Sequence, residues 1–471
     1  MEYVSTRGKA PRVNSIQALL NGLAPDGGLY VPATALAPLP SGQTFRETME
    51  ALLERFFDDL PASIRTAAIS SALERFRVPS ITPLHTCGST QFLELFHGPT
   101  YAFKDIALTL LPHLMKAAAE IAAVGRVCVL TATSGDTGSA AMAGFADVEN
   151  TSVLVFYPRV GTSEIQRRQM VCCPGANVSA CAIEGNFDMA QAAVKAAFAN
   201  PTLAAQAKAQ GVMLSSANSI NIGRLFPQIC YYLDTARQLG RPFDVVVPTG
   251  NFGNILAAHY AKELGAPIER LVVASNVNRV VCDFVRDGRY DARRLFEITN
   301  SPSMDILVSS NVERMLWKLA QGRSSEVAAW EQQLKADGAF TLPADPLQRL
   351  HSEFASGWAT PQETEAAIRD VWEAHHYLVD PHTAIGWKVA RALGLNAPVI
   401  VATASPWKFP VTMVRALTGE TMTDEFAASA RLSALTGEVA ALTELQTAPI
   451  LHTGKTTQAE VPQTIARTFG W

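Results

Sequence analysis

The sequence predicts an α/β protein built on parallel β-sheets. From residue 126 onward, short runs rich in β-branched residues alternate with amphipathic stretches of helix length. Strands separated by helices form right-handed βαβ crossovers, which give parallel sheets. Two glycine-rich turns directly follow predicted strands, at the position where α/β sheets bind ligands. The predicted strands lie at residues 127–133, 152–157, 178–183, 244–248, 271–274 and 399–402.

The length and the composition indicate a compact protein of several packed units. A chain of 471 residues is longer than one hydrophobic core usually supports, so two or three units are expected. Hydrophobic residues make up 48% and charged residues 17%, which argues against disorder. The net charge is -4 and the Lys and Arg residues are scattered, so we expect no nucleic acid and no membrane as a partner.

The N-terminal residues and the cysteines indicate where in the cell the protein is located. The histidine spacing gives no support for a metal site. The N-terminal residues show no apolar segment after their charges, and no stretch reaches the roughly 18 apolar residues of a spanning helix, so we expect a cytoplasmic protein. The seven cysteines include no CxxC pair, which favours reduced, mostly buried thiols. The histidines, including His375, His376 and His382, show no metal-ligand spacing, so structural histidines and no metal are predicted.

The pattern of the chain changes near residue 80. Residues 1–80 have mainly helical apolar spacing and form a plausible first unit. The segment at about 285–370 is more polar, lacks strand signals and is predicted to be a helical insertion. The other helices that the spacing predicts lie at residues 45–60, 64–76, 188–199 and 254–264.

The two glycine-rich turns are candidate anion sites. The first is Thr-Ser-Gly-Asp-Thr-Gly at residues 133–138, and the second is Pro-Thr-Gly-Asn-Phe-Gly-Asn at residues 248–254. Gly250 and Gly253 let the backbone approach an anion closely, and the unpaired N–H groups of the following helix attract it. Neither turn has the third glycine of the dinucleotide-binding fingerprint or the Gly-Lys-Ser/Thr ending of a P-loop, which disfavours a nucleotide as the ligand. For either turn alone, an ordinary tight strand-to-helix connection is the alternative.

Lys104 is a candidate for covalent chemistry. It follows a Gly-Pro turn and leads into an apolar helix predicted at residues 106–115. A free lysine with a pKa of about 10.4 is almost wholly protonated at pH 7, so imine chemistry requires a lower pKa. The helix dipole disfavours a positive charge at the start of a helix, so it lowers the pKa of a lysine placed there. Alone, such a lysine is more often a surface residue, but beside two anion turns it favours a Schiff base.

Several motifs resemble those of threonine synthases, which are fold type II pyridoxal-phosphate enzymes of the tryptophan synthase β-like family. The resemblance implies a mainly helical N-terminal domain over residues 1–80 and a catalytic region over residues 81–471. That region would have a small lobe at about 97–214 and a large lobe at about 215–471, each with a parallel sheet. The motifs follow the family's order at residues 3–8, 22–32, 97–105, 134–138, 218–224 and 248–254.

The resemblance also implies a site for pyridoxal 5'-phosphate. Lys104 would hold the cofactor as a Schiff base and then shuttle protons. The hydroxyl of Thr403 would face the pyridine nitrogen and, unlike an aspartate, would not need to keep it protonated. The cofactor phosphate would be bound by the backbone N–H groups of Gly250, Asn251, Phe252, Gly253 and Asn254.

The substrate implied by the resemblance is O-phospho-L-homoserine. Its phosphate would be held by Asn218, Ser219 and Arg224, whose planar fork suits phosphate oxygens. A carboxylate at Asp136 would repel the cofactor's phenolate unless a proton is shared. The substrate α-carboxylate would bind at a helix N-terminus formed by Ser134, Gly135, Asp136 and Thr137.

The implied reaction is the conversion of O-phospho-L-homoserine and water to L-threonine and phosphate, by γ-elimination and β-addition of water, in the last step of threonine biosynthesis. The chain departs from the family pattern at Ser405, Trp407 and Ile222. A phospholyase or a hydroxy amino acid dehydratase on the same scaffold is an open alternative. A catalytically silent cofactor-binding protein is a further one, although it would have no need of Lys104. A monomer is favoured over a dimer because relatives with this N-terminal domain are often monomers.

Overall fold

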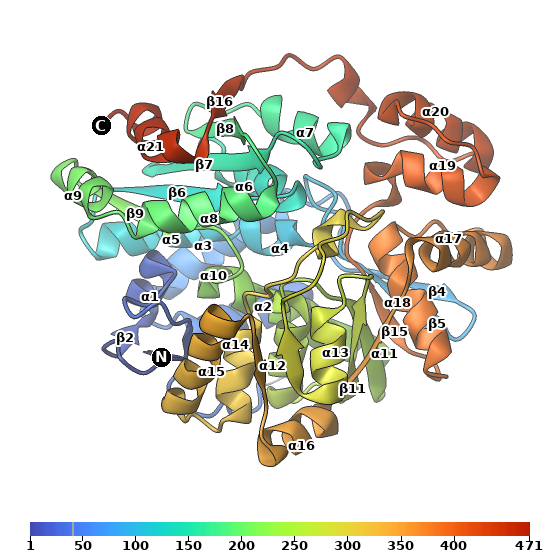
Figure 1. Ribbon diagram of the computed structural model, residues 1–471, viewed down its shortest axis with the longest axis horizontal. Helices are drawn as coiled ribbons and strands as arrows, with labels where there is room; N and C mark the ends of the chain where they lie inside the picture. Colours follow the sequence, from blue (N-terminus) through green and yellow to red (C-terminus); the bar gives the residue numbers. More distant parts are fainter. Residues whose placement is uncertain (40–41) are drawn as a thin grey trace.

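Two parallel β-sheets form the framework of the protein, and the first has five strands (Figure 1). The computed structural model describes residues 1–39 and 42–471. The five-stranded sheet has the order β16-β8-β7-β6-β9, and all its neighbouring strands are parallel. The strands predicted at 127–133, 152–157 and 178–183 are confirmed in it. Its strands are β6 (Arg126–Ala132), β7 (Thr151–Pro158), β8 (Val178–Ile183), β9 (Val212–Ser216) and β16 (Gly454–Thr456).

The second sheet has six strands in the order β14-β11-β10-β15-β5-β4 and lies below the first in Figure 1. All its pairs are parallel except β4 with β5. The strands predicted at 244–248, 271–274 and 399–402 are confirmed, and with them the α/β class. Its strands are β4 (Leu84–Cys87), β5 (Thr90–Glu94), β10 (Phe243–Pro248), β11 (Ile268–Ser275), β14 (Phe354–Trp358) and β15 (Val399–Ala402).

The N-terminal unit packs against the interior of the molecule. The helices predicted at 45–60 and 64–76 are present and somewhat shorter. A small antiparallel sheet of order β2-β1-β3 was not predicted, because its strands are only two to four residues long. The elements of this unit are β1 (Glu2–Ser5), β2 (Val13–Asn14), α1 (Ser15–Asn21), β3 (Tyr30–Pro32), α2 (Phe45–Phe56) and α3 (Ala62–Leu73).

Helices cover the faces of both parallel sheets. The helix predicted at 106–115 is broken in two, because Pro112 has no N–H to donate to the carbonyl of Leu108. The first group is α4 (Lys104–Leu108), α5 (Leu111–Ile121), α6 (Asp136–Phe145), α7 (Glu164–Val171), α8 (Phe187–Phe198) and α9 (Pro201–Ala209). The second is α10 (Ile222–Leu225), α11 (Ile229–Leu239), α12 (Gly253–Glu263), α13 (Val280–Asp287), α17 (Pro361–His375), α18 (Pro381–Ala392), α19 (Pro410–Thr418) and α20 (Glu425–Thr436).

The segment at 285–370 is not the purely helical insertion that the sequence predicted. It contains α14 (Val312–Leu319), α15 (Ser324–Asp337) and α16 (Ala344–Glu353), but also a small hairpin of β12 (Arg289–Asp291) and β13 (Ala339–Thr341). Its last strand, β14, is an edge strand of the six-stranded sheet. This strand was missed because Ala355, Ser356 and Gly357 interrupt its apolar pattern.

The lobes exchange elements near both ends of the catalytic region. β4 and β5 precede residue 97 and belong to the six-stranded sheet, while β16 and α21 (Val461–Phe469) return to the five-stranded sheet. In Figure 1 the C-terminal segment, in red, crosses from α20 back to α21. The predicted lobes at 97–214 and 215–471 therefore do not match the sheets at their outer boundaries, and their division near residue 215 falls within β9, close to its end.

The structure also bears on the membrane and cysteine expectations. Within residues 1–39 and 42–471, no helix combines the length and apolar character needed to cross a membrane. All seven cysteines are buried and free, as predicted.

Candidate active site

One cavity lies where the carboxyl ends of parallel strands from both sheets meet. The turns after β6, β9, β10 and β15 all contribute to its wall, as expected for an α/β ligand site. It encloses about 860 Å³ of empty space, partly open to solvent. Gly135 and the buried Asp136 are the two predicted residues that do not line it. The predicted residues that do are Lys104, Ser134, Thr137, Asn218, Ser219, Arg224, Gly250, Asn251, Phe252, Gly253, Asn254 and Thr403.

The turn before Lys104 is fixed by its neighbour in sequence. The buried carboxylate of Asp105 accepts hydrogen bonds from the backbone N–H of Thr100 at 2.8 Å and from its hydroxyl at 2.6 Å. The N–H of Phe103 donates to the carbonyl of Thr403 at 2.8 Å, which ties the turn to the end of β15. Lys104 is thus held at the start of α4 beside Thr403, in the place that the sequence predicted.

Lys104 has an environment that favours a neutral amine. Burial lowers its pKa, and the positive charges of Lys408 and Arg224 lower it further. Asp136 opposes this effect, with one carboxylate oxygen 3.5 Å from the Lys104 Nζ, but the pKa stays below its ordinary value. The unprotonated fraction near neutral pH is therefore larger than for a surface lysine, as imine formation requires.

Asp136 is engaged by a second lysine that the sequence did not single out. Lys408, in the short helix η3 (Pro406–Lys408), is completely buried and places its Nζ 2.7 Å from Asp136 Oδ1. The same ammonium donates to the carbonyl of Thr100 at 2.8 Å. Burial raises the pKa of Asp136, but Lys408 and Lys104 outweigh burial and hold it well below its ordinary value. Asp136 is therefore an ionised carboxylate whose charge is balanced within the protein.

The turn from Gly250 to Asn254 presents backbone N–H groups to the cavity. Phe252 has a φ of 64° and precedes the first residue of α12. Among the described residues, no acceptor takes a hydrogen bond from the N–H groups of residues 250–254. The Asn254 Oδ1 accepts from two tyrosine hydroxyls, while its buried Nδ2 has no partner in this part of the structure. This set of unused donors suits an anion.

The turn after β9 instead presents side chains. Arg224 is 2% exposed, and one of its NH groups donates to the carbonyl of Ala217. No carboxylate of the described residues pairs with it, and its Nε has no partner there. Burial lowers its pKa to about 10, so it still carries its charge at neutral pH. The Asn218 Nδ2 donates to the carbonyl of Ala132 at 3.3 Å, and its Oδ1, an acceptor, is buried without a partner among the described residues. An unpaired buried cation facing a cavity favours an anionic ligand.

Two further residues that sequence reasoning missed complete the wall. His382 was interpreted as structural, but it lines the cavity, with Nδ1 2.7 Å from Asp380 and Nε2 accepting the N–H of Ser303 at 3.2 Å. The Ser303 hydroxyl donates to Asp136 at 3.0 Å. Ser303 lies in η2 (Pro302–Met304), and its carbonyl oxygen would be 3.0 Å from a Cβ at residue 250, a tight contact that favours glycine there. Among the residues that the sequence analysis did not single out, only Lys408 offered a signal, because it lies close in sequence to Thr403, Ser405 and Trp407.

Metal ligands are not grouped in the part of the chain that the structure describes. No set of three His, Cys, Asp or Glu side chains there could hold a metal ion.

Two family models match the chain. The model described as "Pyridoxal-phosphate dependent enzyme" matches residues 81–334, and the model described as "Threonine synthase N terminus" matches residues 2–72. Together they cover the N-terminal unit and the segments that carry Lys104 and the turns after β6, β9 and β10.

Curated relatives and solved structures extend over most of the chain. A threonine synthase of Pseudomonas aeruginosa is 39% identical over 464 residues, which is 93% of this chain and 97% of that protein. Threonine synthase-like 1 of Macaca fascicularis is 40% identical over 429 residues, 85% of this chain, and the chain spans only 58% of that protein's length. The solved PLP-bound threonine synthase from Brucella melitensis has a TM-score of 0.88, 36% identity and 99% coverage of both chains.

Proposed function

We propose that this chain, which belongs to the threonine synthase family of pyridoxal-phosphate dependent enzymes, converts O-phospho-L-homoserine and water to L-threonine and phosphate, the last step of threonine biosynthesis. The observation that carries the proposal is the pairing of two different anion turns in one cavity with Lys104. One turn suits the phosphate of the cofactor, and the other suits the phosphate of the substrate.

The residues present fit pyridoxal phosphate. The free N–H groups of residues 250–254 and the unpartnered Nδ2 of Asn254 would hold its phosphate. Lys104, with its lowered pKa, would link to it covalently, and the Thr403 hydroxyl would meet its pyridine nitrogen. A neutral hydroxyl there leaves proton transfer to the lysine rather than to a strongly protonated ring.

The bound cofactor would supply an electron sink that acidifies the C–H bonds next to the substrate amine. The amine of Lys104 would take the proton from Cα, give it up, then take a second proton from Cβ, and return a proton to the substrate later in the cycle. The N-terminus of α6, with Ser134 and Thr137, would hold the α-carboxylate, since unpaired N–H groups and the helix dipole favour an anion. Asp136 would not contact the carboxylate, because Lys408 and Gln166 already hold it, the latter at 2.7 Å.

Arg224, Asn218 and Ser219 would bind the substrate phosphate. In γ-elimination the bond from Cγ to oxygen breaks, and the phosphate leaves with the electron pair. Arg224 would stabilise that charge with a bidentate pair of hydrogen bonds inside a buried site. Water then adds its oxygen at Cβ, which gives the hydroxyl group of threonine.

The alternatives differ in the fate of the eliminated substrate. A phospholyase would use the same phosphate turn without adding water at Cβ, and a hydroxy amino acid dehydratase would not need Arg224. The buried, unpaired charge of Arg224 favours a phosphorylated substrate over a plain hydroxy acid. It does not distinguish a synthase from a phospholyase. A catalytically silent cofactor-binding protein would have no use for Lys104.

Product analysis in ¹⁸O-labelled water separates these reactions. The holoenzyme is incubated with O-phospho-L-homoserine. The proposal expects labelled L-threonine and unlabelled phosphate, because the C–O bond breaks and water adds at Cβ. A phospholyase would give 2-oxobutanoate and ammonia instead, and simple hydrolysis would give homoserine with labelled phosphate. Either of these products as the main one would overturn the proposed function.

We also propose a monomeric, cytoplasmic enzyme. The monomer follows from the resemblance, because relatives with this N-terminal domain are often monomers. Seven free, buried thiols fit a reducing compartment. A molecular mass of twice 50.6 kDa in sedimentation equilibrium would contradict the monomer.

A further inference from the structure

The turn that carries Asn218, Ser219 and Arg224 depends on one arginine outside it. Arg314, on α14, is 0% exposed. Its guanidinium donates to the carbonyl of Ser219 at 3.3 Å and also to the carbonyl of Ile220. These two carbonyls lie within the turn, so Arg314 fixes the path of its backbone.

Arg314 also orients the side chain that holds Ser219. It donates to the Asn311 Oδ1, which leaves the Asn311 Nδ2 facing the turn. That Nδ2 donates to the Ser219 hydroxyl at 2.9 Å. The direction of the Ser219 hydroxyl is therefore set through Asn311 by the same guanidinium.

The N-terminal unit forms the opposite wall of this turn. The Nε of Arg314 donates to the carbonyl of Tyr30 at 2.9 Å, and the Nδ2 of Asn221 donates to the carbonyl of Leu19 at 2.9 Å. A Cβ at residue 223 would lie 2.4 Å from the Leu19 side chain, so the chain approaches α1 closely at Gly223. Residues 217–225 are thus held between the N-terminal unit and α14.

A second contact fixes α14 to the N-terminal unit. The Glu313 carboxylate accepts from the Thr6 hydroxyl at 2.6 Å and from Arg7 at 2.9 Å through two nitrogens. Arg314 itself makes no ion pair with the described residues, and its acceptors are carbonyl and amide oxygens. Four acceptors for one rigid fork indicate a geometric role rather than charge compensation.

We propose that Arg314 is a positioning residue that couples the N-terminal unit to the turn at residues 218–224 and thereby sets the affinity of the site for a phosphoryl group. This inference rests on the proposed function, because it takes that turn as the substrate-phosphate site. It assigns a role to the N-terminal motif at residues 3–8, which lies outside the cavity lining.

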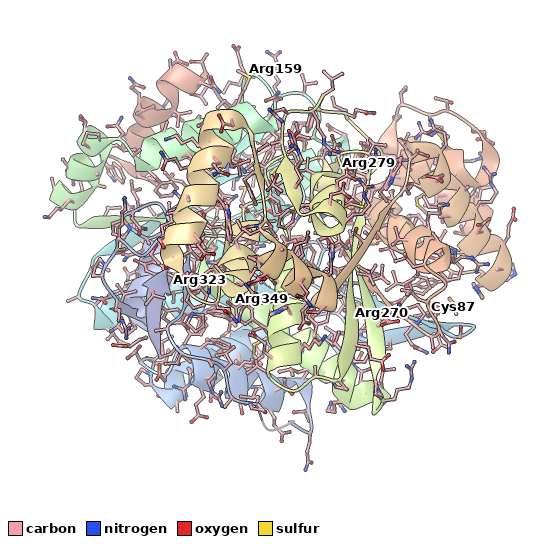
Figure 2. The ribbon with its side chains drawn as sticks, turned by 60° about the horizontal axis from the view of Figure 1, so that its bottom comes forward. Cys87, Arg159, Arg270, Arg279, Arg323 and Arg349 are labelled. Atoms are coloured by element: carbon pink, nitrogen blue, oxygen red, sulfur yellow. The ribbon has the colours of Figure 1, made fainter. Side chains whose placement is uncertain are left out.

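The test compares Arg314→Met, Arg314→Lys and Arg349→Met holoenzymes with the wild type. Arg349 of α16, labelled in Figure 2, donates to the carbonyl of Leu319 at the other end of α14, so it is a control for general support of that helix. Calorimetry measures the binding of inorganic phosphate, with cofactor content and L-serine turnover measured in the same samples. Bound cofactor keeps its own phosphate turn occupied.

We expect Arg314→Met to weaken phosphate binding by about tenfold or more, as for a misplaced charge-assisted hydrogen bond. KM for O-phosphohomoserine should rise more than kcat falls, while cofactor content and L-serine turnover stay near wild type. Arg314→Lys should recover part of the affinity, and Arg349→Met should keep all of it.

Three results would overturn the inference. The first is wild-type phosphate affinity in folded Arg314→Met, or in Arg314→Lys if the methionine variant does not fold. The second is an equal loss of affinity in Arg349→Met. The third is the absence of phosphate binding by the wild type. This result would also contradict the proposed substrate-phosphate site, and it differs from the first two because it is seen without any variant.

Discussion

The two anion turns of the cavity are built in opposite ways. The turn after β10 offers backbone N–H groups at the start of α12, and its Gly250 packs closely against Ser303. The turn after β9 offers side chains, above all the buried guanidinium of Arg224, and is held from outside by Arg314. Both follow parallel strands, so the difference lies in the donors and not in the fold.

This difference suits two phosphates with different residence times. Backbone donors are fixed by the fold and require no side chain to be ordered, which suits a cofactor that stays bound. A charged fork gives stronger bonds that depend on geometry, which suits a group whose charge grows as it leaves. Both turns are supported by residues distant in sequence. The charged guanidinium of Arg314 holds the second turn, whereas neutral groups hold the first, since the Ser309 hydroxyl donates to the carbonyl of Gly250 at 2.7 Å and the N–H of Asn311 donates to the carbonyl of Asn251 at 3.1 Å. The predictions below damage each turn or the residue between them.

Lys104 lies between the turns, and its removal should have the largest effect. Lys104→Ala should lower turnover of every substrate by roughly 10³-fold or more, because proton transfer and covalent attachment are both lost. The phosphate turn at 250–254 is untouched, so the cofactor should still bind, with an altered visible spectrum. Lys116→Ala, at a surface lysine paired with Glu149, should leave both properties unchanged. Activity within tenfold of wild type would remove Lys104 from the chemistry.

Arg224→Leu should damage only the side-chain turn. Loss of one or two charge-assisted hydrogen bonds should lower kcat/KM for O-phosphohomoserine by about ten- to a hundredfold. Cofactor content and L-serine turnover should change little. Arg224→Lys keeps the positive charge but not the planar fork, so its kcat/KM for O-phosphohomoserine should lie between those of the wild type and Arg224→Leu. A parallel loss with both substrates would show that Arg224 is a structural residue.

Gly253→Val should damage chiefly the backbone turn. A Cβ at residue 253 would lie 3.3 Å from Asn311 and 3.4 Å from Ser219, and the branched carbons of valine would crowd the N–H groups further. Cofactor retention after dialysis should drop by about tenfold, equivalent to about 1.4 kcal/mol. Gly253→Ala adds only the Cβ and should lose less. Equal retention in both variants and the wild type would contradict the phosphate assignment of this turn.

A smaller effect, on thermal stability, should come from Glu331 of α15. Its carboxylate lies 3.1 Å from Arg7, the residue that also pairs with Glu313 of α14. Burial and the neighbouring Glu313 raise the pKa of Glu331 to about 7, against the opposing charge of Arg7. An acid with a raised pKa holds its proton in the folded state, so it costs stability as the pH rises from about 4.5 through 7. Glu331→Gln removes this loss, and its Tm should exceed that of wild type by about 2 °C or more at pH 8 but not at pH 5.

Glu326→Gln is the control, at a half-exposed carboxylate on α15, the helix that also carries Glu331. Its Tm relative to wild type should not change in this way between pH 5 and pH 8. A difference in Tm between Glu331→Gln and wild type that is constant from pH 5 to pH 8 would contradict the account of Glu331.

The sequence predicted six inner strands of the two sheets, and it missed the edge strands and the inner strand β5, in which Thr90, Gln91 and Glu94 interrupt the apolar pattern. β6, β7, β8, β10, β11 and β15 are apolar runs covered on both faces, which a pattern reveals. The edge strands β4, β9, β14 and β16 carry polar or small residues such as His85, Ser215 and Lys455, so their hydrophobic signal is weak. Lobe boundaries that depend on these edges were therefore the least accurate part.

Local sequence patterns also decided which residues of the candidate site could be predicted. Residues within strand-to-helix turns, such as Gly250 and Arg224, could be identified because local motifs carry them. His382 and Ser303 reach the cavity from separate segments, and only tertiary structure shows that Ser303 and the buried Lys408 both contact Asp136. The assigned roles of all these residues stay predictions until tested.

The most direct test is a crystal structure of the holoenzyme with a non-hydrolysable phosphonate analogue of O-phosphohomoserine. The account predicts two phosphoryl groups in one cavity. The cofactor phosphate should contact the N–H groups of residues 250–254, and the phosphonate should contact Asn218 and the guanidinium of Arg224. A phosphonate bound elsewhere with Arg224 unliganded, or a cofactor phosphate at Arg224, would contradict the division of the two turns.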